Sequence, residues 1–426
     1  MRRFFGTDGV RGRVGEPPMT PEFVLRLGRA AALELGGPLF IGRDTRASGP
    51  MLEAALAAGA LAAGVEVWRL GVLPTPGVAY LVGAEGARAG AVISASHNPY
   101  DDNGVKFFGE GGRKLPDAVE AAIEARLEDA SYREGGRVLE SGEGAERYLR
   151  HLLAQAPGLS GKKIVVDAAN GATYRLAPEL FSRAGARVFA IGTSPDGKNI
   201  NRGLGATAPE TMARLVAELG YDLGVAFDGD GDRAIFADHK GRIFDGDHVL
   251  YLAAKALGFK KVVGTIMSNL GLELALKEFG AELVRAKVGD RYVAEAMEET
   301  GALVGAEPSG HVIFKERFFT GDGMLTALVV LELLEKTGST LADWVDALVL
   351  FPQVIENVRV RDKRRVMEHP RLLEWIAEAE AALGEGRINV RPSGTEPVIR
   401  VMVEGRDEET VKRVARELGK KIAALE

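Results

Sequence analysis

The chain has 426 residues, of which 46% are hydrophobic and 27% charged, as in ordinary soluble globular proteins, and its length suggests two to four domains. Its formal net charge of −6, with no block of lysine and arginine, argues against a nucleic-acid partner. Because the chain contains no cysteine, disulfides, zinc–thiolate sites and thiol nucleophiles are excluded.

The N-terminal segment shows no targeting signal. Residues 1–6 lack the apolar core of a signal peptide, and the most apolar later stretch, residues 324–334, contains Glu332 and is too short to span a bilayer. We therefore expect a soluble, cytoplasmic protein with no membrane partner. Residues 5–12 form a glycine-rich loop with an exposed arginine, Arg11, although an Asp-Gly pair is first of all a turn signal.

A strand–helix–strand–strand order then occurs three times. The expected strands lie at 38–42, 65–68 and 91–93, then at 164–166, 187–190 and 223–227, then at 262–263, 282–284 and 302–304. The expected helices lie at 51–63, 176–184 and 272–279. This alternation predicts three similar α/β domains in tandem with parallel or mixed sheets, at residues 1–150, 151–248 and 249–352.

The pattern changes in the last part of the chain, residues 353–426. Strands are expected at 354–360, 387–390 and 399–403, with a helix at 371–383. A closing helix carries apolar residues on one face, namely Val411, Val414, Ala415, Leu418 and Ile422. We predict a smaller α+β domain here.

Three aspartates, Asp228, Asp230 and Asp232, directly follow the apolar strand at 223–227. An extended backbone would put alternate side chains on one side, and the intervening glycines let the loop curl. Two carboxylates about 4 Å apart repel by roughly 4 kcal/mol at an effective dielectric near 20. A convergent triplet therefore favours a hard divalent cation, Mg²⁺ or Ca²⁺ rather than zinc.

The triplet has two other interpretations. An EF-hand is excluded because Arg233 and His239 stand where it needs glycine and glutamate. A solvated acidic turn is less favoured, because sites in α/β sheets lie where strands end. Mg²⁺ usually completes its shell with phosphate or water, which directs attention to phosphate chemistry elsewhere in the chain.

Ser96 follows the last strand of the first unit and lacks the Gly-x-Ser-x-Gly context of a hydrolase. In an extended segment the neighbouring His97 would point away from it and be a poor general base. A serine without a base suits a phosphate carrier, which would bring nearly two negative charges to a metal. A simple Ser/Asn/Pro turn is the alternative.

Two further loops offer binding groups. Arg391, Ser393, Gly394, Thr395 and Arg400 provide the guanidinium groups, hydroxyls and amides that a phosphate monoester needs, without a Walker ending, although a plain turn is also compatible. Glu307, Ser309 and His311 suit sugar hydroxyls. Lys106 and Lys287 are candidates for acid/base chemistry or phosphate contacts, although single lysines are more often solvated.

With these motifs the chain resembles the α-phosphohexomutase superfamily over its full length. Four stretches of this chain resemble loops of that superfamily. Residues 96–99 resemble its phosphoserine loop, 228–233 its metal loop, 307–311 its sugar loop and 391–397 its phosphate loop. Residues 5–12, 167–172, 199–201 and 400–405 resemble the bacterial phosphoglucosamine mutase branch. Ala306 and Pro308 replace the glycine and glutamine usual in that branch, which bears on how strictly a C2 amino group is distinguished from a hydroxyl.

The resemblance implies an isomerase, an intramolecular phosphotransferase, with four loops meeting in one cleft. It implies interconversion of glucosamine 6-phosphate and glucosamine 1-phosphate, toward UDP-N-acetylglucosamine and peptidoglycan precursors. Mg²⁺ would be held by Ser96 and the three aspartates, and glucosamine 1,6-bisphosphate would be the intermediate. Arg233 would hold the transferred group, with Lys106 as acid/base and His97, His311 and Arg11 lining the site.

The expected partner is a phosphosugar, and the resemblance suggests a homodimer. Three alternatives stay open. They are a phosphomannomutase/phosphoglucomutase of the same fold, a non-catalytic sugar-phosphate sensor, and a phosphatase in which water discharges the phosphoserine.

Overall fold

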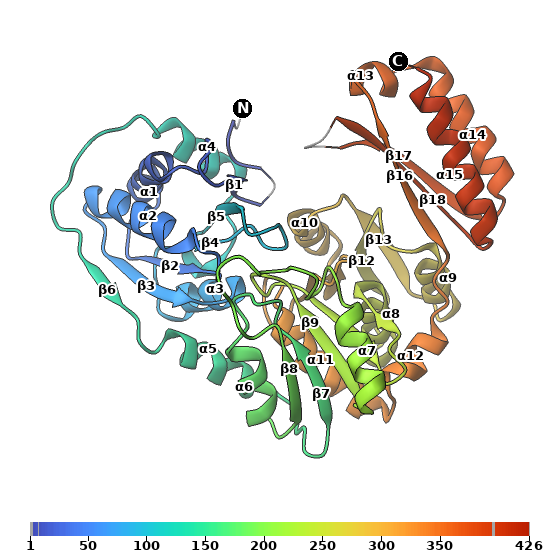
Figure 1. Cartoon of the computed structure of the whole chain (residues 1–426), viewed down its shortest axis with the longest axis horizontal. Helices are drawn as coiled ribbons and strands as arrows, with labels where there is room; N and C mark the ends of the chain where they lie inside the picture. The colour runs from blue at the N-terminus through green and yellow to red at the C-terminus, as the bar shows by residue number, and fades with distance from the viewer. Residues whose placement is uncertain (1–2, 7, 394–396, 426) are drawn as a thin grey trace.

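The computed structural model describes residues 3–6, 8–393 and 397–425. The chain forms four α/β units that follow one another from the N-terminus to the C-terminus (Figure 1). Three larger units carry mixed sheets and the fourth is smaller, which confirms the predicted fold class. The boundaries after residues 150, 248 and 352 stay a prediction. Within the described ranges, no helix combines the length and apolarity needed to cross a bilayer.

The first unit has a six-stranded sheet in the order β1-β5-β4-β2-β3-β6. Its strands are β1 (Val10–Arg13), β2 (Leu39–Arg43), β3 (Val67–Val72), β4 (Ala89–Ile93), β5 (Asp102–Phe108) and β6 (Val138–Glu140). Its helices are α1 (Pro21–Leu35), α2 (Gly49–Ala62), α3 (Thr75–Ala84), α4 (Asp117–Ala125) and α5 (Gly144–Leu153), with the short 3₁₀ helix η1 (Glu110–Gly112).

The second unit has a five-stranded sheet in the order β11-β10-β9-β7-β8. Its strands are β7 (Lys163–Asp167), β8 (Arg187–Ile191), β9 (Leu223–Phe227), β10 (Ala234–Asp238) and β11 (Ile243–Phe244), and its helices are α6 (Leu176–Arg183) and α7 (Glu210–Leu219). Strands β7 and β9 are parallel, and Ile164–Val166 of β7 and all of β9 are apolar and buried, as expected for a sheet covered on both faces.

The third unit has a four-stranded sheet in the order β13-β12-β14-β15. Its strands are β12 (Lys261–Thr265), β13 (Glu282–Ala286), β14 (Val304–Ala306) and β15 (Val312–Phe314). Its helices are α8 (Gly246–Leu257), α9 (Leu270–Glu278), α10 (Asp290–Thr300), α11 (Gly323–Thr337) and α12 (Leu341–Ala347).

The last unit has an antiparallel sheet in the order β16-β18-β17. Its strands are β16 (Gln353–Arg359), β17 (Gly386–Pro392) and β18 (Val398–Gly405). Its helices are α13 (Lys363–Met367), α14 (Pro370–Leu383) and α15 (Glu408–Ala423). The apolar face predicted for the closing helix is buried on α15.

The predicted repeat was incomplete in two respects. In each unit the last predicted strand is followed by an antiparallel partner, β5, β10 or β15, which the sequence analysis did not predict. Two successive parallel strands need a crossover connection, and the structure provides it with α3, α7 and α10, which the sequence analysis omitted. Helix α3 is hydrophobic nearly all round, so it lacks the amphipathic period that marks a surface helix.

One hydrophobic core extends through the first three units. It includes Phe40, Phe227 and Leu328, one from each unit, together with their neighbours. The last unit packs a separate core around Val401, Val414 and Trp375. The first three units therefore form one packed body, to which the last unit is attached with a core of its own.

Candidate active site

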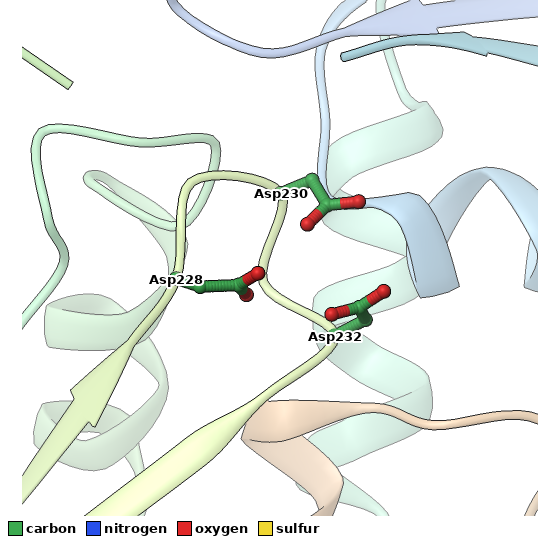
Figure 2. A group of neighbouring side chains, drawn as sticks. All are labelled: Asp228, Asp230 and Asp232. Atoms are coloured by element: carbon green, nitrogen blue, oxygen red, sulfur yellow. The ribbon is translucent and has the colours of Figure 1, made fainter. Parts of the chain in front are cut away.

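The aspartate loop closes the turn between the antiparallel strands β9 and β10. Figure 2 shows the side chains of Asp228, Asp230 and Asp232 pointing toward a common centre. One carboxylate oxygen from each lies within 4.8 Å of the others, and all three residues are buried. The predicted convergence and the curling of the loop at its glycines are confirmed, but the expected extended backbone is wrong. The loop is a tight turn, in which the Gly231 amide donates to the Asp228 carbonyl (3.1 Å) and Gly231 has φ +76°, rather than an extended segment.

The triplet has the chemistry of a hard-cation site. In the described part of the chain, Oδ1 of Asp230 and Oδ1 of Asp232 are buried without a hydrogen-bond partner. Burial, together with the charges of Asp232 and Asp230, raises the pKa of Asp228 well above its ordinary value. Unpaired carboxylate oxygens that repel one another are what a divalent cation stabilises, and a set made only of oxygens suits Mg²⁺.

Ser96 lies directly against this triplet. Its Oγ donates to Oδ2 of Asp228 at 2.7 Å, and the residue is 1% exposed. The approach depends on Gly229, because a Cβ there would stand 2.5 Å from the Ser96 carbonyl oxygen. The loop after β4 and the loop after β9, from different units, therefore form one site.

The prediction that His97 points away from Ser96 is wrong. Ser96 has φ +51°, and this left-handed turn brings Nδ1 of His97 to 3.2 Å from the Ser96 Oγ. Burial, followed by the charges of Arg233 and Arg11, lowers the pKa of His97 to about 4. The imidazole is therefore neutral at pH 7.

A buried network that the sequence analysis missed holds the serine loop. Arg46 pairs with Asp44 and donates to the carbonyl oxygen of Ser96 at 3.2 Å. From the second unit, Nδ2 of Asn201 donates to the same carbonyl at 2.9 Å. A signal for this network was present in the sequence. The charged residues Arg43, Asp44 and Arg46 stand where an apolar strand ends, which is also where the other functional loops were found.

Lys106 lies among the carboxylates. Its Nζ is 2.8 Å from Oδ2 of Asp230, 2.9 Å from Oδ2 of Asp8 and 3.6 Å from Oδ2 of Asp232. Burial alone would lower the pKa of Lys106, but these three carboxylates outweigh it and raise the pKa above its ordinary value. The ammonium is therefore charged in this arrangement.

Asp8, which the sequence analysis did not single out, connects several of these groups. It pairs with Arg11, Lys106 and Lys114, and Lys114 in turn pairs with Asp290 of the third unit. Asp8 lies in the glycine-rich segment already noted, whereas nothing in the local sequence marks Lys114. This ion network joins the first and third units at the site.

The sugar loop lies beside the metal loop. The backbones of Arg233 and His311 form an isolated antiparallel bridge. Arg233 Nε is 4.0 Å from Oδ2 of Asp228 and 3.9 Å from Oδ1 of Asp232. Nε2 of His311 is 3.7 Å from Oδ2 of Asp290, and Glu307 accepts from the Gly289 amide at 3.1 Å. Loops from three units thus meet.

The remaining predicted residues are less closely joined. Ser309 is half-buried between Glu307 and His311, whereas Lys287 is exposed with its ammonium 5.6 Å from the centre of the Tyr292 ring. Arg391 and Arg400 face each other across β17 and β18, where Nη2 of Arg391 is 3.9 Å from the Met267 sulfur.

Two predicted phosphate-loop residues, Gly394 and Thr395, lie outside the described residues. Ser393 is buried, and its amide donates to the Val398 carbonyl at 2.9 Å. Arg391 and Ser393 contact residues of the third and fourth units. These contacts do not place the phosphate loop against Ser96, so the meeting of all four loops in one cleft stays a prediction.

Comparison with known proteins agrees with this geometry. Four phosphoglucomutase/phosphomannomutase models match the chain: α/β/α domain I at residues 2–134, domain II at 146–241, domain III at 245–350 and the C-terminal domain at 356–421. A phosphoglucosamine mutase of Thermus thermophilus is 60% identical over 100% of this chain and 98% of its own length. The chain belongs to the phosphoglucosamine mutase family. It is therefore a phosphosugar mutase, as the sequence motifs predicted.

Two further relatives support this family assignment. The phosphoglucosamine mutase of Deinococcus radiodurans is 52% identical over 98% of this chain and 97% of its own length. The crystal structure of a phosphoglucomutase/phosphomannomutase family protein from Burkholderia thailandensis superposes with a TM-score of 0.81 at 27% identity, covering 100% of this chain and 98% of that one. The four-unit fold is therefore that of the family.

Proposed function

We propose that this protein interconverts glucosamine 6-phosphate and glucosamine 1-phosphate through phosphorylated Ser96 and glucosamine 1,6-bisphosphate, a step toward UDP-N-acetylglucosamine and peptidoglycan precursors. The observation that carries the proposal is the buried Ser96 Oγ at 2.7 Å from Asp228, the first of three convergent carboxylates. A serine in that position suits a phosphoryl carrier, and family membership indicates the amino sugar. Cytoplasmic location and a homodimer stay predictions.

Mg²⁺ is the cation that we assign to Asp228, Asp230, Asp232 and a phosphate oxygen on Ser96. When bound, it neutralises charge on the phosphoryl group and stabilises the transition state as a Lewis acid. The support is the set of buried, unpartnered carboxylate oxygens in the described residues.

The chain's own groups then position the reactants. The bond from phosphorus to Ser96 Oγ breaks as a bond from phosphorus to the sugar oxygen forms. The proton that leaves the sugar hydroxyl must reach Ser96 Oγ for the transfer to balance, and Lys106 is the residue proposed for this acid/base role. Arg233 holds the transferred group, and Arg11, His97 and His311 line the site. Transfer of this kind depends mainly on positioning and electrostatics.

The sugar and its second phosphate need separate binding groups. Glu307, Ser309 and His311 are proposed to bind sugar hydroxyls, and Lys287 is proposed to contact a phosphate of the substrate. In the last unit, Arg391, Ser393, Gly394, Thr395 and Arg400 are proposed to grip the phosphate that is not reacting. The bisphosphate must turn end for end between the two transfers, and a separately packed last unit can open and close to permit this.

The second candidate is a phosphomannomutase/phosphoglucomutase. Pro308, with Ala306, is the observation that favours it, because both stand in the loop proposed to contact the sugar. In that case the same phosphoryl chemistry would act on a neutral hexose.

A coupled assay distinguishes these functions. Glucosamine 6-phosphate, glucose 1-phosphate and mannose 1-phosphate are offered with Mg²⁺ and a trace of 1,6-bisphosphate. We expect a kcat/KM at least tenfold higher for the amino sugar, about 1.4 kcal/mol of discrimination. Ser96→Ala should be inactive, and the exposed Ser160→Ala should match the wild type. Preference for a hexose would support the second candidate, and no turnover with Ser96 phosphorylated would refute both.

A further inference from the structure

The two oxygens of the Asp230 carboxylate have different environments. Oδ2 accepts from the Thr75 hydroxyl at 2.6 Å and from Lys106 Nζ at 2.8 Å. Oδ1 is buried and has no hydrogen-bond partner within the part of the chain that the structure describes. One oxygen is therefore occupied by protein donors, while the other is left for a ligand.

Thr75 is the better placed of the two donors to fix this orientation. Lys106 is shared among Asp8, Asp230 and Asp232, whereas the hydroxyl of Thr75 donates to Asp230. The Thr75 amide also donates to the carbonyl oxygen of Asp230 at 2.9 Å. Side chain and backbone of the aspartate are thus both held by one residue of another unit.

The start of α3 is packed against the metal loop around these bonds. Thr75 is 5% exposed and is the first residue of the helix. A Cβ on Gly231 would stand 3.2 Å from Cβ of Pro74 and 2.6 Å from Cγ2 of Thr173. The residue before α3 and Thr173 thus leave space for a glycine at this point of the loop but not for a larger side chain.

We propose that Thr75 is a positioning residue that restricts Asp230 to a single metal-binding oxygen and thereby favours Mg²⁺ over Ca²⁺. Mg²⁺ requires near-octahedral geometry, whereas Ca²⁺ readily accepts both oxygens of one carboxylate. Occupation of Oδ2 therefore selects against the larger ion. This inference rests on the proposed cation site.

The test measures ion binding directly by titration calorimetry on the full chain, with Ser96 phosphorylation matched between variants by mass spectrometry. Thr75→Val removes the hydroxyl at nearly constant shape, and Thr75→Ser keeps it. Thr173→Val is a matched control, because Thr173 is buried beside the same loop and its hydroxyl has no partner among the described residues. Metal-free thermal unfolding checks that each variant is folded, and Thr75→Ala replaces Thr75→Val if that one is not.

We expect Thr75→Val to raise the Mg²⁺ dissociation constant about tenfold, the usual range for an outer-shell partner, and the Ca²⁺ constant by less than about threefold. Thr75→Ser and Thr173→Val should stay within about threefold of the wild type for both ions. Unchanged Mg²⁺ binding by folded Thr75→Val would overturn this inference but not the cation site. An equal loss of Mg²⁺ affinity in Thr75→Ser would do the same. Failure of the wild type to bind either ion would overturn the cation site as well.

Discussion

Arg46 is the largest side chain that the structure buries completely, and it lies beneath the serine loop. Its partner Asp44 is also fully buried and accepts from the Ser94 hydroxyl at 2.6 Å, which in turn accepts from the Ser96 amide at 2.9 Å. Buried residues that bond to the backbone of Ser96 thus help to hold the serine loop in place. A buried charge pair of this kind costs most when only one partner is removed.

We predict that Arg46→Met destabilises the body formed by the first three units by about 3–5 kcal/mol, because the Asp44 carboxylate is left buried without its counter-charge. Urea unfolding measures this loss. Unfolding is monitored by the fluorescence of Trp68 in a background where Trp344 and Trp375 are replaced by phenylalanine. The double variant with Asp44→Asn should lose less than Arg46→Met alone. Equal or greater loss in the double variant would contradict the argument.

Asp167 provides a pH-dependent prediction. Burial raises the pKa of Asp167 from 3.8 to about 6, although the amides of Gly205 and Ala169 donate to it and partly offset that rise. The folded state therefore binds the proton more tightly than the unfolded state. The burial penalty is absent below about pH 4, grows as the pH rises to about 6, and is complete above that.

We expect the wild type to lose about 3 kcal/mol of stability between pH 4 and 6 through this group, since one pKa unit corresponds to about 1.4 kcal/mol. Thermal unfolding of the wild type and Asp167→Asn across this range measures the difference, because all other groups are common to both. Parallel pH profiles would refute the assignment.

At the scale of elements, the site depends on how closely the loop after β9 approaches the loop after β4. Gly229 permits that approach, since its missing side chain leaves room for the Ser96 carbonyl oxygen. Gly171 has the same effect on the other side, where a Cβ would stand 2.5 Å from the Gly229 carbonyl oxygen. Three backbone segments are therefore stacked without side chains between them.

We predict that Gly229→Ala lowers kcat by about 100-fold or more while the protein stays folded, because a displacement near 1 Å at the reacting groups has costs of that order. Steady-state kinetics and circular dichroism test the two parts separately. Gly158→Ala is the control, since a Cβ there meets no heavy atom within 4 Å. A kcat within threefold of the wild type would show that the loops can separate freely.

For the whole molecule, the separate core of the last unit is the feature that bears on domain movement. Arg387 pairs with Glu404, which is fully buried, and donates to the carbonyl oxygens of Ile266 and Ser268 at 2.8 Å. These contacts attach the last unit to one loop of the third unit. Figure 1 shows the β16–β18 sheet extending away from the body formed by the other three units. Such an attachment is suited to rigid-body rotation.

We predict that binding of glucosamine 1,6-bisphosphate reduces the radius of gyration measured by small-angle X-ray scattering. The double variant Arg391→Ala and Arg400→Ala should show no such reduction, and its KM should rise about tenfold or more, because hydrogen bonds to charged groups contribute about 1.5–3 kcal/mol each. Compaction of the variant to the same degree would show that these arginines do not drive closure.

Local sequence patterns were sufficient to predict several features of this protein. Short apolar strands alternating with helices dictate α/β units, and polar loops after those strands fall at the sheet edges where sites form. The aspartate triplet needed only its spacing and its position after β9 to indicate a cation site. These properties follow from one segment at a time, which is why they could be predicted.

The family resemblance implied that Ser96 meets the aspartates, but the other distant groups of the site became clear only from the folded arrangement. The left-handed backbone at Ser96 turned His97 toward the serine, and Asp8, Arg46, Thr75 and Lys114 entered the site from other segments. Among the crossover helices, α3 has no amphipathic period of its own and was required by parallel pairing, whereas α7 and α10 are amphipathic and carried a local signal that the sequence analysis did not use. Long-range packing and charge pairing join residues more than 100 positions apart, and no local pattern encodes that proximity.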